Sequence, residues 1–265
     1  MKKKMLFKGF ILGLTSVMTL GLTGCADTSS ETSSSASSSS STSQSNSYET
    51  DAVITDQMAM PQPGEQIAVF NVEGYGTFQA RLFPEAAPKA VENFVELASE
   101  GAYNGVPFHR VVEDFMIQSG DTTLNGGDGQ SIYGSGFGVE LNESLHHYTG
   151  ALAVARTSSK SSGQSTQFYI VSNQSTKDYT DADWNALEKQ TGVAFDEATR
   201  AAYQQYGGAP SLDMNYTVFG QVFAGQEVVD AIAAASVELN PQTGENSAPN
   251  PEIILSSVEI TTYQG

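Results

Sequence analysis

The chain has 265 residues, with 30 acidic and 12 basic side chains and a formal net charge of −18 at pH 7. Phosphate repels such an acidic chain, so we expect no binding to nucleic acid. A single cysteine excludes a disulfide-bonded scaffold and a cysteine-rich zinc site. The length is sufficient for a sizeable hydrophobic core.

The N-terminus has the pattern of a secretory signal. Lysines at positions 2–4 and Lys8 precede an uncharged, mostly apolar run over residues 9–22. Basic residues, a short apolar run and small residues, in that order, are typical of a signal peptide. The segment ends in Leu22-Thr23-Gly24-Cys25, which resembles the cleavage box of bacterial lipoproteins.

The lipoprotein resemblance implies a membrane anchor. In that family the signal is cut before the cysteine, so residues 1–24 would be removed and Cys25 would carry lipid, a diacylglycerol and palmitate. We therefore expect an extracytoplasmic chain, lipid-anchored to the bacterial cell membrane. The alternative is an uncleaved membrane anchor, because no charge occurs between Gly9 and Ala26. The glycine and threonine content makes this span a weak membrane-spanning helix.

Residues 25–64 are predicted to form a lipid-anchored, Ser/Thr-rich flexible tether. Residues 26–47 contain no aliphatic side chain larger than alanine. Such a segment cannot bury enough apolar surface to offset the entropy of ordering its backbone. It is either a tether that lifts a domain off the membrane or a tolerated low-complexity spacer. Residues 65–265 are then the folded domain.

The folded domain begins with strand-like runs. Gln66–Val72 and Thr77–Phe83, joined by a glycine-containing turn, predict a hairpin. From Pro88 onward, apolar residues recur at helical spacing and predict an amphipathic helix. A second short helix is expected at Glu227–Ala235. Further strands are predicted at Phe108–Val112, Phe115–Gln118, Ala151–Ala155, Gln167–Val171, Thr217–Phe223 and Ile253–Thr261.

Many short strands with few helices favour an antiparallel barrel or sandwich. Residues 179–208 interrupt this pattern and predict an inserted helical hairpin. Thr180–Asp183 has the form of a capping box, and Gly207 and Gly208 end the second helix. The acidic C-terminal third is interpreted as a solvated surface.

One segment combines side chains that suit a binding pocket. Residues 108–121 contain Arg110, then Phe115 and Met116, then Gln118. One arginine, one amide and a Phe/Met surface predict an apolar pocket with a single cationic wall.

At these residues the sequence resembles the cyclophilin-type peptidyl-prolyl cis-trans isomerases. The family signature is an F-H-R run, a short turn and then F-M-x-Q-x-G-D, which matches residues 108–121. Further matches follow in the family's order at Ser131–Gly134, Gly150–Ala155, Ser165–Ile170 and Tyr216–Gly220. The resemblance covers about residues 66–262. It implies a mainly β fold, a closed eight-stranded antiparallel cyclophilin-like barrel capped by two helices.

The resemblance implies catalysis of rotation about X–Pro bonds. Amide resonance sets a barrier of about 18–20 kcal/mol, and no covalent bond is broken. We therefore expect no nucleophile, no metal and no cofactor. The implied partners are proline-containing polypeptides, unfolded or extended, in secreted or surface proteins. We expect the protein to be a monomer.

The family's functional residues have counterparts in this chain. Arg110 matches the catalytic arginine, whose guanidinium donates to the prolyl nitrogen of the twisted amide, and Gln118 matches the glutamine that orients it. Without the resemblance, Arg110 would be interpreted as a surface ion pair and the apolar residues as core. The implied substrate-binding residues are Phe115, Met116, Phe168 and Leu212 in the proline pocket, Gln167 and Tyr216 on its walls, and Ala155 and Arg156 along the peptide backbone.

Two positions depart from the family pattern. Arg156 stands where the family often has asparagine, which predicts an altered sequence preference. Ser211 stands where many members have a tryptophan, which predicts weak cyclosporin binding. The only tryptophan, Trp184, lies in the insertion, where packing beneath the helical hairpin is favoured over folding across the groove.

Other functions stay open at the level of sequence. The main alternative is a non-catalytic proline-peptide-binding module or a holdase chaperone on the same fold, and a surface adhesin rests on location alone. A metal site would have to use His109, His146 and His147, whose spacing fits no standard ligand pattern.

Overall fold

The computed structural model describes residues 48–49, 56–124, 127, 129–241 and 243–265. The predicted signal peptide, Cys25 and most of the predicted tether lie outside the described residues. Within the described part of the chain, no helix is both long and apolar enough to cross a bilayer.

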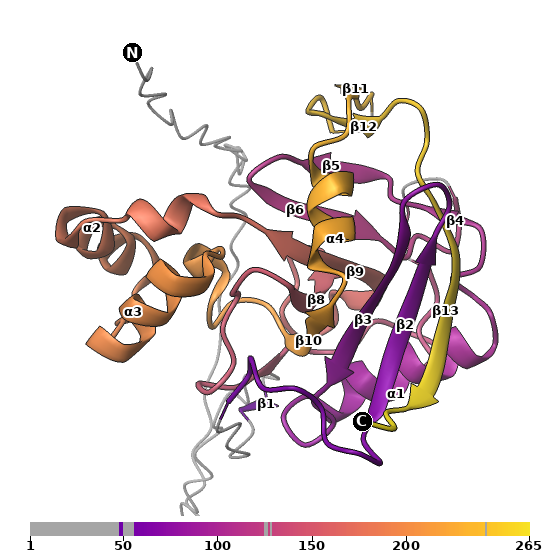
Figure 1. Ribbon diagram of the computed structural model, residues 1–265, viewed down its shortest axis with the longest axis horizontal. Helices are drawn as coiled ribbons and strands as arrows, with labels where there is room; N and C mark the ends of the chain where they lie inside the picture. Colours follow the sequence, from indigo (N-terminus) through magenta and orange to yellow (C-terminus); the bar gives the residue numbers. More distant parts are fainter. Residues whose placement is uncertain (1–47, 50–55, 125–126, 128, 242) are drawn as a thin grey trace, which may run out of the picture. The chain divides into compact units, whose positions relative to one another are not determined.

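Most of the elements are short strands, and four α-helices occur among them in the described residues (Figure 1). In chain order they are β1 (Tyr48–Glu49), β2 (Gln66–Val72), β3 (Gly76–Leu82), α1 (Pro88–Ser99), β4 (Val106–Pro107), β5 (Arg110–Val112), β6 (Phe115–Ser119), β7 (Glu140–Leu141), β8 (Ala151–Arg156), β9 (Gln164–Ser172), η1 (Ser175–Asp178), α2 (Asp181–Thr191), α3 (Glu197–Tyr206), η2 (Pro210–Leu212), β10 (Val218–Ala224), α4 (Gln226–Ala233), β11 (Val237–Leu239), β12 (Asn246–Pro249) and β13 (Ile254–Thr262).

Nine of these strands form one antiparallel sheet in the order β4-β13-β2-β3-β10-β8-β9-β6-β5. The prediction of a mainly β, antiparallel fold is confirmed. The closed eight-stranded barrel is not confirmed, because the sheet has nine strands and no pairing joins β4 to β5 in the described residues. The predicted strand Phe108–Val112 is shortened to Arg110–Val112, which pairs with β6. A separate strand that was not predicted, Val106–Pro107, pairs with β13. Only Phe108 and His109 separate the two ends of the sheet along the chain.

The sheet and two helices enclose an aromatic core. β2 and β3 pair as the predicted hairpin, with alternate residues buried, as expected for strands with one face toward a core. The ring of Phe94, from α1, lies 5.5 Å from that of Phe168 and 5.2 Å from that of Phe219. α1 packs on β13 and β9, while α4 packs on β3, β6 and β9. Both predicted barrel helices are thus confirmed, each with its apolar face buried.

The predicted helical insertion is also confirmed, as α2 and α3. Thr180 donates from its backbone to the Asp183 carboxylate at 2.8 Å, so the start of α2 has the expected capping contact. Trp184 is 1% exposed and packs against Phe195 and Tyr203, with ring centroids 5.4 and 5.8 Å away. The tryptophan is therefore a core residue of the insertion, and the expectation of packing beneath the hairpin is confirmed.

Candidate active site

Strand pairing places Arg110 and Gln118 side by side. β5 and β6 pair with Arg110 opposite Gln118, and the turn between them is made possible by Asp114 at φ 56°. Side chains directly opposite in an antiparallel pair lie on the same face. Nη1 of Arg110 accordingly lies 3.5 Å from Oε1 of Gln118 and 3.8 Å from Sδ of Met116.

These residues open onto a cavity of about 150 Å³. Eight of the residues predicted from the sequence meet there, from β5, β6, β8, η2 and the end of the loop before β10, and one unpredicted residue joins them. The lining consists of Arg110, Phe115, Met116, Gln118, Ala155, Arg156, Tyr169, Leu212 and Tyr216. We call this cavity the proline pocket, after the role that the resemblance predicts for it.

The placement of Phe168 in the proline pocket is wrong. Phe168 is 1% exposed and packs inside the sheet against Phe70 and Phe94. The next residue, Tyr169, lines the pocket instead. The cause is the alternation of β9, which sends adjacent side chains to opposite faces. Gln167 and Tyr169 are two residues apart in the strand and therefore lie on the same face. This spacing was the signal in the sequence that identifies Tyr169 as the pocket residue.

Gln167 does not line the cavity but holds Gln118 in place. Nε2 of Gln118 donates to Oε1 of Gln167 at 2.8 Å, and Nε2 of Gln167 donates to the carbonyl of Gly127 at 2.9 Å. Since the Gln118 amide nitrogen is used in this way, its oxygen is turned toward Arg110. The chain of amides thereby fixes which end of Gln118 faces the arginine.

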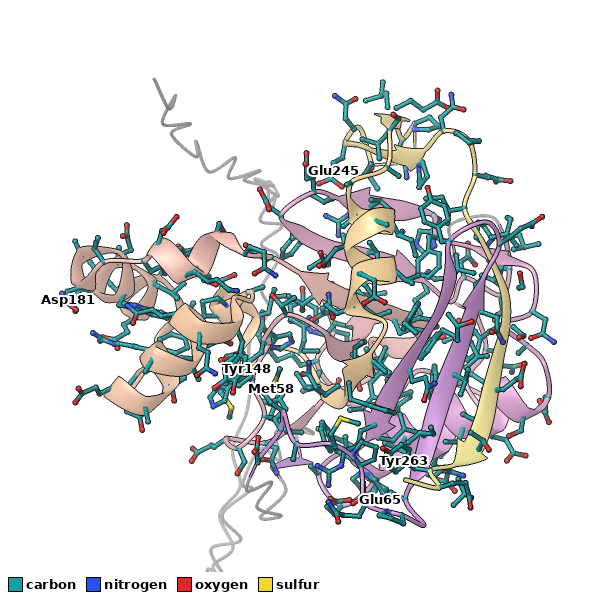
Figure 2. All side chains as sticks on the ribbon, viewed as in Figure 1. Met58, Glu65, Tyr148, Asp181, Glu245 and Tyr263 are labelled. Atoms are coloured by element: carbon teal, nitrogen blue, oxygen red, sulfur yellow. The ribbon has the colours of Figure 1, made fainter. Side chains whose placement is uncertain are left out.

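Glu245 is a partner of Arg110 that the sequence analysis missed. Its carboxylate, on the β11–β12 hairpin (Figure 2), accepts from Nε of Arg110 at 2.7 Å and from Nη2 at 3.2 Å. The two side chains are 28% and 38% exposed, so the pair stands at the rim of the pocket. The hydrogen bond from Arg110 lowers the pKa of Glu245, which keeps this carboxylate ionised at neutral pH.

Arg156 is fixed against the opposite rim. It donates to the carbonyl and the side-chain oxygen of Asn215 at 3.1 and 2.7 Å, and its guanidinium carbon lies 4.5 Å from the ring centre of Tyr216. Stacking of arginine on an aromatic ring is favourable. The residue therefore braces Tyr216, which walls the pocket.

A buried hydrogen-bond network lies behind the pocket. The hydroxyl of Tyr169 lies 3.0 Å from Nε2 of His147, and Nδ1 of His147 lies 2.8 Å from Asp213. Asp213 also accepts from Tyr203 at 2.7 Å and contacts Nδ1 of His146 at 2.8 Å. Burial would raise the pKa of Asp213, but the hydrogen bonds from both histidines outweigh it and lower the pKa to about 2.

His109 lies next to Arg110 but is not part of the pocket lining. Burial lowers its pKa, despite the attraction of nearby Asp121, so the imidazole is neutral at pH 7. Within the described residues, no group of three His, Cys, Asp or Glu side chains is arranged to hold a metal ion.

Comparison with known proteins places these features in a family. Residues 67–260 match the model of the cyclophilin type peptidyl-prolyl cis-trans isomerases. The chain is 36% identical over 197 residues to a protein of Staphylococcus saprophyticus whose name describes it as a peptidyl-prolyl cis-trans isomerase, and the match covers 74% of this chain and 93% of the relative. A Staphylococcus aureus protein of the same description is 36% identical over 200 residues, which are 75% of this chain and 93% of the relative.

A solved structure is similar as well. It is a cyclophilin type isomerase of Cryptosporidium parvum, determined in the presence of the dipeptide Ala-Pro. The sequence identity is 25% and the TM-score 0.56, and the match covers 74% of this chain and 99% of that one.

Proposed function

Because the chain belongs to the cyclophilin-type peptidyl-prolyl cis-trans isomerases, we propose that it isomerises X–Pro bonds of secreted or surface polypeptides with the assistance of Arg110. One observation carries this proposal. The proline pocket combines apolar and aromatic walls with a guanidinium whose Nη1 lies beside Gln118 and Met116.

The proposed chemistry is hydrogen bonding to a twisted amide. Resonance keeps the prolyl peptide planar and makes rotation slow. At the top of the barrier the prolyl nitrogen is pyramidal and regains its lone pair, so a donor aimed at it binds the transition state better than the planar ground state. Nη1 of Arg110 is that donor. Removing one preorganised donor in other enzymes costs about 10²–10³ in rate.

Two neighbours position this donor. Glu245 holds Nε and Nη2 of Arg110, and because the guanidinium is a rigid plane, this fixes the direction of Nη1. Gln118 contacts Nη1 from within the pocket. Glu245 is therefore assigned as a positioning residue.

The apolar walls hold the proline ring. Met116 is fully buried beneath the pocket, and Phe115, Leu212 and Tyr216 are partly exposed around it. An apolar ring that enters this space loses contact with water, which favours binding by about 25 cal/mol per Å² of apolar area buried. Burial raises the pKa of Tyr169 well above its ordinary value, so its hydroxyl stays neutral.

Measurement of cis–trans exchange tests this function. The full chain in detergent should accelerate the exchange of a short Ala–Pro peptide, followed by NMR exchange spectroscopy, above the rate in buffer. Circular dichroism confirms that the protein is folded. A folded protein that leaves the exchange of several X–Pro peptides unchanged would refute the proposal.

The location is proposed from the signal and the lipoprotein box. We place the isomerase outside the cytoplasm, held at the membrane by lipid on Cys25. Wild type should be labelled by a radioactive or alkyne palmitate, and Cys25→Ala should abolish this labelling. Equal labelling of wild type and variant, or no labelling of wild type, would contradict the lipid anchor.

A second candidate is a holdase or peptide-binding module on the same fold. Two observations favour it: Arg110 is already engaged by Glu245, and exposed Ser211 supplies no aromatic wall. A holdase would suppress the aggregation of an unfolded client equally in wild type and in Arg110→Ala. Absence of isomerisation together with such suppression would select this candidate.

A further inference from the structure

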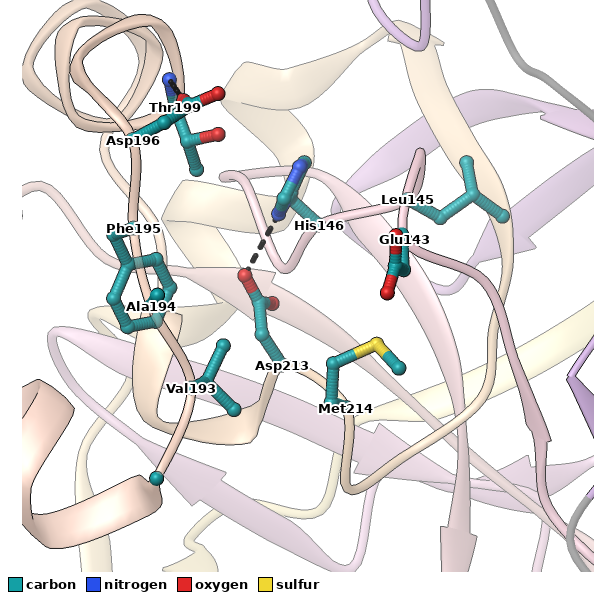
Figure 3. A pocket seen from close by; sticks show the side chains of 11 residues that line it. Glu143, Leu145, His146, Val193, Ala194, Phe195, Asp196, Thr199, Asp213 and Met214 are labelled. Carbon is teal, nitrogen blue, oxygen red and sulfur yellow. Dashed lines mark hydrogen bonds and ion pairs between the residues drawn. The ribbon is translucent and has the colours of Figure 1, made fainter.

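A second and larger cavity lies between the helical insertion and two loops, residues 143–146 and 213–214 (Figure 3). Its volume is about 620 Å³. The walls come from the 143–146 loop, the link between α2 and α3, and the segment after η2. The apolar part of the lining consists of Leu145, Val193, Ala194, Phe195 and Met214. We call it the insertion cavity.

The insertion cavity and the proline pocket share one wall. Leu212 and Tyr216 line the proline pocket, while Asp213 and Met214, which lie between them in the chain, line the insertion cavity. Leu145 lines the insertion cavity and belongs to the same apolar cluster as Met116, Leu212 and Tyr216. A chain held at one site is therefore close to the other.

The charge of the insertion cavity is negative. Its lining includes the carboxylates of Glu143, Asp196 and Asp213 and includes no lysine or arginine. The one other titratable side chain in the lining, His146, is hydrogen-bonded to Asp213. A cationic side chain is thus the favoured occupant, with its apolar part against the apolar wall.

The walls are formed before anything binds. Asp213 accepts four hydrogen bonds, from the backbone and Nδ1 of His147, from Nδ1 of His146 and from the hydroxyl of Tyr203. Asp196 caps α3 by accepting from the backbone of Thr199 at 2.7 Å. Because these groups are already ordered, an occupant need not supply the free energy to order them.

We propose that the insertion cavity binds the stretch of polypeptide flanking the X–Pro bond and prefers a basic side chain beside an apolar one. The proposal rests on the isomerase function proposed above. It makes the insertion a selector of substrates: chains with a basic flank would be isomerised more efficiently than chains with an acidic one.

The first test compares flanks on one proline. A short Ala–Pro peptide is compared with longer peptides in which the flank, on either side of the proline, carries lysines, serines or glutamates next to a leucine. For the full chain in detergent, kcat/KM for the lysine flank should exceed that for the glutamate flank about two- to fivefold, since ion pairs near solvent contribute modestly. Added salt should reduce the difference.

Variants at exposed Ala194 test the place of binding. Ala194→Arg puts a positive charge on the cavity wall and should remove the preference for lysine, whereas Ala194→Glu should keep or increase it. Ser256→Arg, at an exposed position of β13, adds the same charge elsewhere and should leave the preference as in wild type. Equal kcat/KM for all flanks, or a preference that Ala194→Arg does not alter, would overturn the proposal.

Direct binding separates this proposal from the function on which it rests. The only tryptophan, Trp184, packs on Phe195 of the cavity lining, so its fluorescence should respond to an occupant. A lysine-flank peptide with alanine in place of proline should change this fluorescence, and the glutamate version should bind more weakly. Loss of isomerisation with retained fluorescence binding would refute the function alone. Normal isomerisation of the short peptide with no binding of the proline-free peptide would refute the cavity alone.

Discussion

The two cavities on either side of the Leu212–Tyr216 segment use their polar groups differently. In the proline pocket, Arg110 is 28% exposed and its Nη1 faces the cavity. At the insertion cavity, the Asp213 side chain is 2% exposed, and protein donors bind both its oxygens. The same short segment therefore lines a pocket whose polar group, Arg110, is available for chemistry and contributes Asp213 to a buried network that stabilises the fold. Proximity and charge alone do not identify a catalytic group; an available donor or acceptor does.

The largest effect should follow from disrupting the buried network around Asp213. Asp213→Ala leaves the donors of His146, His147 and Tyr203 without their acceptor in the interior. Loss of one partner of a buried charged network costs about 3–5 kcal/mol, so the free energy of unfolding should fall by that amount. Urea unfolding followed by Trp184 fluorescence measures it. Exposed Glu143→Ala is the control, with a change within about 0.5 kcal/mol. A similar small change for Asp213→Ala would show that the network is not structural.

The pH dependence of stability tests the same buried network. The pKa of Asp213 is lowered from 3.8 to about 2 in the folded protein. A carboxyl group with a lowered pKa stabilises the fold at pH above its unfolded value, and this contribution is lost as the pH falls through the folded value. We expect about 2 kcal/mol of stability to disappear between about pH 4 and pH 2. Unfolding curves of wild type and Asp213→Asn across this range should converge toward low pH; a constant difference would contradict the assignment.

Changes in the proline pocket should affect the catalytic rate more than the stability of the fold. Glu245→Ala frees the guanidinium of Arg110 to take other orientations, and kcat should fall about tenfold, as expected for the loss of one charged hydrogen-bonded partner. KM should change little, and Glu245→Asp should restore part of kcat. Steady-state kinetics on a short X–Pro peptide separate the two constants. An increase of kcat in Glu245→Ala would instead identify Glu245 as an inhibitory partner.

The smallest effect concerns the link between the two sites. Tyr169→Phe keeps the ring in the proline pocket and removes the hydroxyl that contacts His147. The free energy of unfolding should fall by about 1 kcal/mol, the usual contribution of one hydrogen bond. Denaturant unfolding measures this loss.

A pair of leucine variants tests which residue of β9 lines the proline pocket. We expect Tyr169→Leu to bind the peptide more weakly than Phe168→Leu. If Phe168 were the pocket residue, Phe168→Leu would impair peptide binding as much as Tyr169→Leu.

Local patterns explain what could be predicted. The β2–β3 hairpin, α1 and the insertion helices have strong periodicity and clear turn residues, and the motif around Arg110 lies within one hairpin. These features depend on residues that are near one another in the chain. The unpredicted strand Val106–Pro107 depends instead on β13, whose partner residues lie far along the sequence.

Contacts between residues far apart in the chain explain which features could not be predicted from the sequence. Glu245 is 135 residues from Arg110 and lies in a hairpin whose first strand, Val237–Leu239, is exposed on every residue, so no alternation marks it. The meeting of His146 and His147 with Asp213 likewise spans more than sixty residues. Phe168 differs, because strand alternation from Gln167 was present in the sequence and would have selected Tyr169.

The most direct test of the account is the catalysed exchange of a short X–Pro peptide by wild type and by Arg110→Ala, with peptide affinity measured in the same NMR samples. We predict that the variant remains folded, binds the peptide within a fewfold of wild type and loses about 10²–10³ of the catalysed rate. A variant that retains the wild-type rate would contradict the role of Arg110 as the donor to the twisted amide.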